Sequence, residues 1–212
     1  IVMKTPFEHF KTDTTVVQIE ENLYEGNLSD RWSIGKTPNG GYTMALAAKA
    51  ISESLNHNDP LVITANYLNR LDFGKVLVSV EVLPFTKSLS SARATMLQDD
   101  EIKVIFTATF TDFLKTKGLN KSFRQEPAFV DYEDCIFHPF KEGFNPKLEK
   151  NLEKKYCKDS IWWENSKKEN DAVLNLYMSW PEKETVDLFT LILFLDATTL
   201  SLIHISEPTR RL

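Results

Sequence analysis

The sequence has few of the residues that build catalytic or metal-binding motifs. Its two cysteines, Cys135 and Cys157, have neither a CxxC spacing nor a neighbouring pair of histidines, so we interpret both as reduced thiols and expect neither a disulfide nor a metal site. The four histidines are scattered and form no HExxH motif. GxSxG and GxGxxG patterns are also missing, which argues against an α/β-hydrolase serine and a dinucleotide-binding loop. We therefore expect no metal and no cofactor.

The chain also lacks long apolar runs and an excess of positive charge. The apolar run over residues 188–195 is ended by Asp196 and is far shorter than the roughly 20 residues that a membrane-spanning helix needs. A net charge of −5 provides no basic surface for nucleic acid. We recognise no signal peptide in the sequence that begins at Ile1. We expect an intracellular protein, cytoplasmic or peroxisomal, with no membrane span and no nucleic-acid partner.

What is present is organised around residues 37–51. Pro38 fixes a backbone angle, Asn39 can cap a helix, and the Gly40-Gly41 pair allows a sharp turn or a close approach to a ligand. Residues 42–55 then predict a helix with small or apolar side chains around nearly its whole circumference. A helix of this kind is buried rather than lying on a surface.

Alternating apolar and polar residues dominate the next part of the chain. Residues 61–70, 75–84, 90–98 and 102–111 predict four strands, and Asp99-Asp100 makes a turn between the last two. Strands of period two joined by short turns indicate an antiparallel meander. A buried helix followed by this meander predicts an α+β fold in which a curved sheet surrounds a central helix.

Short motifs in this region resemble the N-terminal half of TesB-like acyl-CoA thioesterases, which have a double hot-dog fold. The motifs are WSIG at residues 32–35, PNGGY at 38–42, DPL at 59–61, TANYL at 64–68, VEVL at 80–83, KS at 87–88, SARA at 91–94 and Gln98. The resemblance covers residues 15–113 and resumes near Trp180. It implies a hot-dog fold, hydrolysis of fatty acyl-CoA to a free fatty acid and CoA, and a homo-oligomer.

Two other functions stay open for a chain with this fold. A non-catalytic acyl-binding or scaffold hot-dog domain would need the same core without the reacting groups. A hot-dog hydratase is less well supported, because the sequence has no Asp and His paired at the spacing of that motif.

The resemblance divides the chain into three parts. Residues 1–114 are expected to form the N-terminal hot-dog domain and residues 115–170 a charged connection. Asn145-Pro146 can open a short helix in this connection, which we expect over residues 147 to about 156. Residues 171–212 are expected to begin a second hot-dog domain.

This second half repeats the order of strand, turn and helix. Residues 171–180 predict a strand and residues 185–203 a second buried helix. TesB-like proteins carry a full sheet after this helix, so the second hot-dog is expected to be incomplete in this chain. Residues 201–212 also resemble a peptide found at the ends of unrelated translated library sequences. We expect the native frame to end near Leu200, and a native basic C-terminus is the alternative.

Asp196 is the candidate catalytic residue. It lies in an apolar segment, where a charge is costly unless it is paired or used in catalysis. TesB-like thioesterases carry a catalytic Asp at the matching place, where a carboxylate can orient or deprotonate a water. The structural alternative is an Asp that is hydrogen-bonded to a neighbouring loop. The family also uses a Thr and a Gln from later strands that lie beyond these residues, so the 212-residue chain is expected to have little or no activity.

Asn39, Gly40, Gly41 and Tyr42 are the candidate substrate-binding residues. They match the corresponding turn of the family, and N–H groups at a helix N-terminus can stabilise an oxyanion. For the two glycines we favour a conformational explanation, in which the turn requires them. On that explanation Gly41 has a positive φ, and Gly41→Val is strained.

Overall fold

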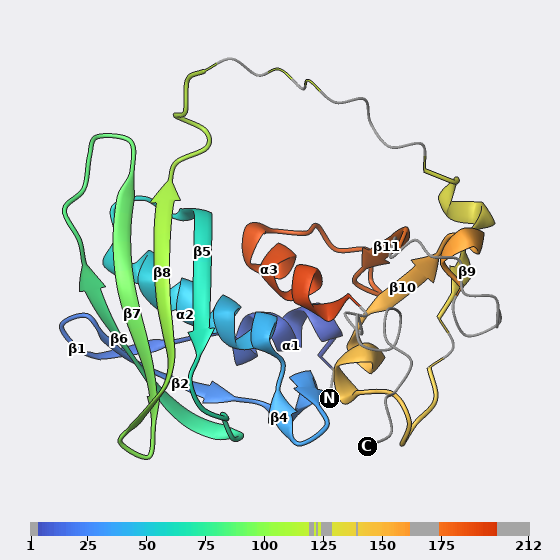
Figure 1. The fold of residues 1–212 in the computed structure, drawn as a ribbon, viewed down its shortest axis with the longest axis horizontal. Helices are drawn as coiled ribbons and strands as arrows, with labels where there is room; N and C mark the ends of the chain where they lie inside the picture. The colour runs from blue at the N-terminus through green and yellow to red at the C-terminus, as the bar shows by residue number, and fades with distance from the viewer. Residues whose placement is uncertain are drawn as a thin grey trace, which may run out of the picture.

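The computed structural model describes residues 4–118, 121, 123, 129–138, 140–161 and 174–198. Its centre is helix α2 (Gly40–Ser54), which packs against one face of a six-stranded sheet (Figure 1). Asn39 caps this helix, because its side-chain Oδ1 accepts the N–H of Tyr42 at 2.9 Å. The predicted buried helix and its cap are both confirmed.

The six-stranded sheet is antiparallel throughout and has the order β1-β2-β6-β7-β8-β5. Its strands are β1 (Val17–Glu20), β2 (Leu23–Leu28), β5 (Asp59–Tyr67), β6 (Gly74–Val82), β7 (Ser90–Gln98) and β8 (Glu101–Thr111). Asp99 and Asp100 both have positive φ, at 53° and 61°, as a two-residue hairpin turn requires. The predicted α+β class is therefore confirmed. The meander is confirmed for β6, β7 and β8 only, because β5 pairs with β8 instead of β6 and lies at the edge of the sheet.

Alternation along the strands places apolar side chains against α2. Val76, Val78 and Val80 of β6 are buried, and the facing positions of β7 and β8 are buried in the same way. Those positions are Ala92, Ala94, Met96, Val104, Phe106, Ala108 and Phe110. The small residues of α2 let the helix axis approach this surface closely, so helix and sheet share one core.

The chain reaches this core through short elements. Helix α1 (Pro6–Asp13) begins with a capping box, which Thr5 and Glu8 form. A 3₁₀ turn η1 (Asp30–Trp32) and a small hairpin of β3 (Ser33–Ile34) and β4 (Thr37–Pro38) then lead into α2.

A second region lies beside the first. Its three-stranded sheet has the order β11-β10-β9 and consists of β9 (Ile136–Phe137), β10 (Glu153–Tyr156) and β11 (Leu176–Ser179). Three 3₁₀ turns flank these strands: η2 (Tyr132–Asp134), η3 (Lys147–Asn151) and η4 (Lys158–Ser160). Helix α3 (Leu188–Ala197) follows and packs against α2.

The prediction of a helix over residues 147–156 is wrong. Only the 3₁₀ turn η3 forms there, and Leu152 is extended with ψ of 142° before β10 begins. Strand β10 pairs with β9 on one side and β11 on the other, and these partners override the local helical pattern. The expected connection thus contributes two strands, while the proposed domain boundaries stay predictions.

Helix α3 is shorter than the helix predicted over residues 185–203. It begins at Leu188, where the carboxylate of Asp187 accepts the N–H of Thr190 at 2.7 Å. It ends at Ala197 because Thr198 is extended, with ψ of 149°. The predicted strand appears as β11, and residues 171–173 and 199–212 lie outside the described residues.

Aromatic side chains join the two regions. Trp180 is fully buried, with its ring centroid 5.5 Å from Phe10, 6.1 Å from Trp32 and 5.2 Å from Phe194. These contacts tie α1 and η1 to α3. In the part of the chain that the structure describes, no helix has both the length and the apolar character needed to cross a membrane.

Candidate active site

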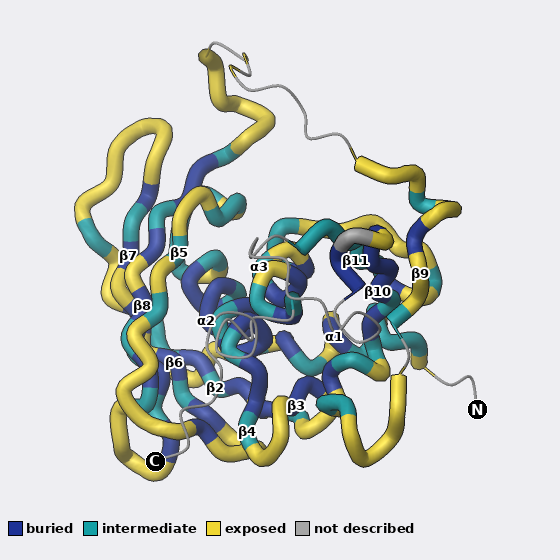
Figure 2. Tube along the Cα trace, turned by 45° about the vertical axis from the view of Figure 1, so that its right-hand side comes forward, coloured by how far each residue is buried: buried dark blue, intermediate teal, exposed yellow. Residues whose placement is uncertain are grey.

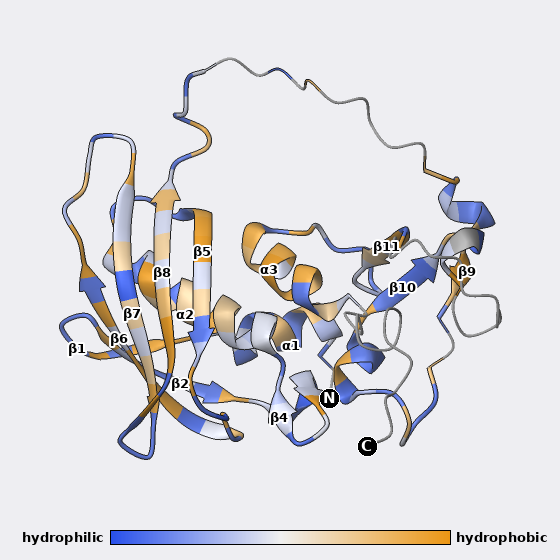
Figure 3. Ribbon diagram, in the orientation of Figure 1, coloured by the Kyte–Doolittle hydropathy of each residue, from blue (hydrophilic) through white to orange (hydrophobic). Residues whose placement is uncertain are grey.

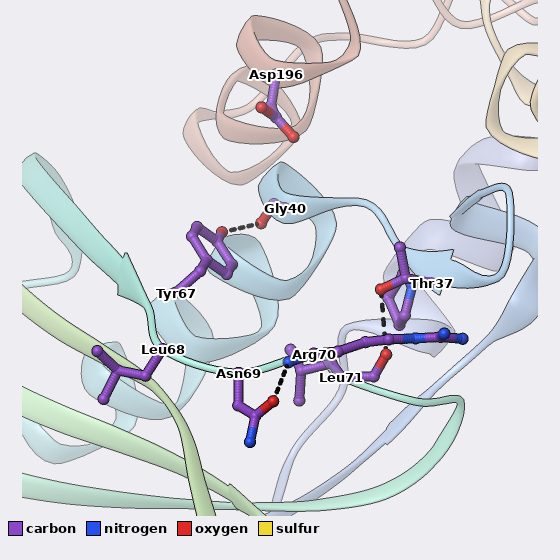
Figure 4. Close-up of a pocket in the computed structure, with 9 residues that line it drawn as sticks. Thr37, Gly40, Tyr67, Leu68, Asn69, Arg70, Leu71 and Asp196 are labelled. Carbon is purple, nitrogen blue, oxygen red and sulfur yellow. Dashed lines mark hydrogen bonds between the residues drawn. The ribbon is translucent and has the colours of Figure 1, made fainter. Parts of the chain in front are cut away.

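A cavity of about 640 Å³ opens where the start of α2, the end of β5 and the end of α3 meet (Figure 4). Its volume lies within the range of small-molecule sites in proteins. The lining residues are Thr37, Pro38, Gly40, Tyr67, Leu68, Asn69, Arg70, Leu71 and Asp196. Strand β4, helix α2, strand β5 with the segment after it, and helix α3 all contribute, so the cavity exists only in the folded chain.

Asp196 is the carboxylate of this cavity. Its Oδ2 atom accepts two hydrogen bonds of 2.7 Å, from the N–H of Gly41 and from Nδ2 of Asn39. The N-terminus of a helix favours a negative charge, because its N–H groups are free and the helix dipole is positive there. Its Oδ1 atom has no hydrogen-bond partner among the described residues, and the residue borders the cavity. The charge is thus paired through one oxygen, while the other can act on a ligand.

Asn39 links the helix cap to this carboxylate. Its Oδ1 accepts the N–H of Tyr42, and its Nδ2 donates to Asp196. Both ends of the amide are therefore used, and the orientation of the side chain is set by the network around it. The residue is itself buried, so it positions Asp196 rather than lining the cavity.

Gly41 is needed for packing rather than for backbone conformation. It is the second residue of α2, and it is not among the glycines with positive φ. A Cβ atom at this position would lie 2.7 Å from Cβ of Asp196 and 2.8 Å from the carbonyl oxygen of Ile192. The prediction of a positive φ is therefore wrong. The glycine lets the backbone of α3 touch α2, which brings Asp196 to the N–H groups.

Tyr67 lines the cavity beside Gly40. Its hydroxyl donates to the carbonyl oxygen of Gly40 at 2.7 Å and lies 3.5 Å from Oγ1 of Thr43. Figure 4 shows this hydroxyl pointing from β5 toward the start of α2. Burial of the phenol raises the pKa of Tyr67 to about 12, so it is protonated at neutral pH. The sequence assigned Tyr67 no role. Side chains alternate between the two faces of a strand, so Tyr67 lies on the same face of β5 as Ile63 and Ala65.

Residues 28–111 match the family model of the acyl-CoA thioesterase N-terminal domain. The chain is also 33% identical over 92 residues to the thioesterase-like protein TwmA of Talaromyces wortmannii, a match that covers 42% of this chain. This chain spans about 26% of the length of that curated relative.

Solved structures with the same architecture extend over both regions. A hot-dog-fold protein of unknown function from Alicyclobacillus acidocaldarius has a TM-score of 0.76 at 18% identity, over 89% of this chain and 68% of that one. The acyl-CoA thioesterase II TesB2 from Mycobacterium marinum has a TM-score of 0.69 at 14% identity, over 95% and 72%. These likenesses show the fold. The predicted hot-dog fold and the resemblance to TesB-like thioesterases are confirmed.

Tyr42 lies in the segment that matches the family model, but it does not line the cavity. Its hydroxyl donates to the carbonyl oxygen of Asp13 at 2.9 Å and accepts the N–H of Ser29 at 3.1 Å. Burial raises the pKa of Tyr42 well above that of a free tyrosine. The side chain joins α2 to the N-terminal segment, so of the four predicted substrate-binding residues only Gly40 borders the cavity.

Lys154 of β10 binds the end of α3. Its Nζ donates to the carbonyl oxygen of Ala197 at 2.6 Å and lies 3.2 Å from Oε1 of Glu149. A cation at a helix C-terminus satisfies a free carbonyl and complements the helix dipole. Burial lowers the pKa of Lys154. Strand β10, which sequence reasoning missed, thereby supports the residue next to Asp196.

Proposed function

We propose that this protein hydrolyses acyl-CoA thioesters in the cavity that Asp196 borders. The observation that carries the proposal is the pairing of Asp196 with the start of α2, which leaves one carboxylate oxygen free beside the cavity. The acyl-CoA thioesterase domain supports the substrate class.

Asp196 would activate the attacking water. Its free Oδ1 takes a proton from the water as the water oxygen bonds to the thioester carbonyl carbon. The carbon–sulfur bond then breaks, and the CoA thiolate leaves with the proton that the carboxylate took up. The products are a free fatty acid and CoA.

Gly40 would stabilise the oxyanion that forms on the carbonyl. Its N–H is the first of α2, and among the described residues it has no hydrogen-bond partner. An N–H group at the positive end of a helix dipole stabilises a developing negative charge. The Tyr67 hydroxyl donates to the Gly40 carbonyl, which lies in the following peptide unit, and so holds the backbone of Gly40 from its C-terminal side.

Arg70 would face the phosphate groups of CoA. It lines the cavity, and its Nη2 donates to the carbonyl oxygen of Lys36 at 2.6 Å. Asp72 lies 3.4 Å from the same atom, but both side chains are largely exposed and the pair is weak. A guanidinium at this rim can bind phosphate oxygens through two parallel hydrogen bonds.

Release of free thiol from medium- and long-chain acyl-CoA tests the proposal. We expect Asp196→Asn to lower kcat by about 100-fold or more, because general base catalysis contributes factors of this size. Asp100→Asn is the matched control, since this exposed residue of the β7–β8 turn is not among the residues that line the cavity. Turnover that survives Asp196→Asn would refute the role of Asp196.

Asn39→Asp separates the positioning of Asp196 from the stability of α2. Aspartate caps helices as well as asparagine does, so the cap of α2 is kept in this variant. A second carboxylate 2.7 Å from Oδ2 of Asp196 would repel it, and turnover should fall. Binding of acyl-CoA in calorimetry without hydrolysis would agree both with the acyl-binding alternative and with the low activity expected of these 212 residues.

A further inference from the structure

The two cysteines, which are 22 positions apart in the sequence, lie together in the second region. Their Sγ atoms are 3.4 Å apart, and both thiols are free and buried. Cys135 lies between η2 and β9, and Cys157 directly follows β10. The sequence offered no sign of this proximity, because strand pairing alone brings the two residues together.

The register of β9 and β10 places the cysteines opposite each other. Phe137 pairs with Lys155 and Ile136 with Tyr156, so the next pair in this antiparallel register is Cys135 with Cys157. The N–H of His138 donates to the carbonyl oxygen of Lys154, which makes that pair a hydrogen-bonded one. Hydrogen-bonded and non-hydrogen-bonded pairs alternate along an antiparallel ladder, so the cysteines occupy a non-hydrogen-bonded position.

This position suits a disulfide. Residues at non-hydrogen-bonded positions have Cα atoms about 4.5 Å apart, which is within the 4.4–6.8 Å range that disulfides span. The backbone N–H groups also bond elsewhere, that of Cys135 to Tyr132 and that of Cys157 to Asn175. A cross-link therefore needs no ladder hydrogen bond to break and only a small movement of the two sulfur atoms.

We propose that Cys135 and Cys157 are an oxidisable pair that forms a disulfide by exchange with a low-molecular-weight disulfide such as oxidised glutathione. One cysteine thiolate attacks a glutathione sulfur and releases one glutathione thiolate. The second cysteine thiolate then attacks the protein sulfur of this mixed disulfide and releases the other. Two protein thiols are oxidised and one glutathione disulfide is reduced to two thiols.

The disulfide would stabilise the region that supports α3. It would tie the chain at η2 and β9 to β10, whose Lys154 bonds the last carbonyl of α3. Cross-linking residues 22 positions apart restricts the unfolded chain and should raise Tm by roughly 5–10 °C. The inference stands independently of the proposed thioesterase activity, since it concerns the thiols alone.

Incubation of the full 212-residue chain with oxidised glutathione tests the pair. Intact-mass measurement after unfolding should show the loss of two hydrogen atoms with no glutathione attached, and non-reducing digestion should give one peptide that links the two cysteines. Melting should move upward by the expected amount and return after reduction with dithiothreitol.

Cys135→Ser and Cys157→Ser are the matched controls. Each keeps one thiol, so each should take up glutathione or stay reduced, with no upward shift in Tm. The proposal is overturned if the parent keeps both thiols, carries only glutathione adducts, or forms only cross-links between chains. These readouts on the parent do not depend on whether the variants fold.

Discussion

Helices α2 and α3 pack against each other and are both strongly apolar, yet their burial differs. Helix α2 is enclosed by five strands on one side and by α3 on the other, and most of its residues are buried (Figure 2). Helix α3 is buried at Thr190, Leu193, Phe194 and Ala197, while Leu191 and Leu195 are 43% and 65% exposed. Figure 3 shows that α3 is coloured as hydrophobic along most of its length.

The difference shows that an apolar helix sequence predicts that the helix is buried, but that the surface covering the helix has to come from other segments of the chain. The sheet residues that cover α2 come from the neighbouring part of the chain. The three-stranded sheet is shorter, and its strands have two to four residues each. The sequence predicts exposed apolar surface at Leu188, Leu191, Ile192 and Leu195. Leu191 and Leu195 are exposed, whereas Leu188 and Ile192 are half-buried. Exposed apolar surface of this kind promotes association, so the expected homo-oligomer stays a reasonable prediction.

The largest expected effect is a contrast between one substitution in each helix. Leu46→Ala should cost about 2–5 kcal/mol, because Leu46 is fully buried under Gly26 and the sheet. Leu195→Ala should cost less than about 0.5 kcal/mol, because its side chain is 65% exposed. Urea unfolding measures both free energies. Equal costs would mean that Leu195 is covered in solution, for instance by a second copy.

A smaller effect is expected where the two helices touch. Gly41→Ala should cost about 1–3 kcal/mol and should also lower turnover, because the added Cβ would push against Asp196 and the carbonyl of Ile192. Gly118→Ala is the matched control, since no atom lies within 4 Å of a Cβ there and its φ is not positive. It should change the free energy of unfolding by less than about 0.5 kcal/mol. An unchanged stability for Gly41→Ala would contradict the close contact of α2 and α3.

The smallest effect concerns alkaline pH. Burial raises the pKa of Tyr67 to about 12 from the ordinary tyrosine value of 10.0, so the phenol ionises first in the unfolded chain. Its contribution to stability is full below pH 10.0 and is lost as the pH rises toward about 12. Tyr67→Phe should therefore make stability fall less steeply over this interval than it does in the parent. Ultraviolet titration of the phenols in the parent and variant checks the assignment, and identical curves above pH 10.0 would refute it.

Local patterns predicted much of the first region. The cap at Asn39, the turn at Asp99-Asp100 and the strands that surround α2 follow from residues close together in sequence. The polar partner of Asp196 was left open, because its bond to Gly41 joins residues 155 positions apart. The local sequence around either residue gives no sign of this contact.

The sequence by itself determined where α2 begins, which faces of the strands turn inward and that Asp196 needs a partner or a function. These follow from steric limits, period-two alternation and the cost of burying a charge. Only the tertiary structure decided that Gly41 serves α3 rather than a turn, that Lys154 lies in a strand and that Cys135 faces Cys157. Each of these depends on segments that meet across the fold, where packing and strand pairing outweigh local preference.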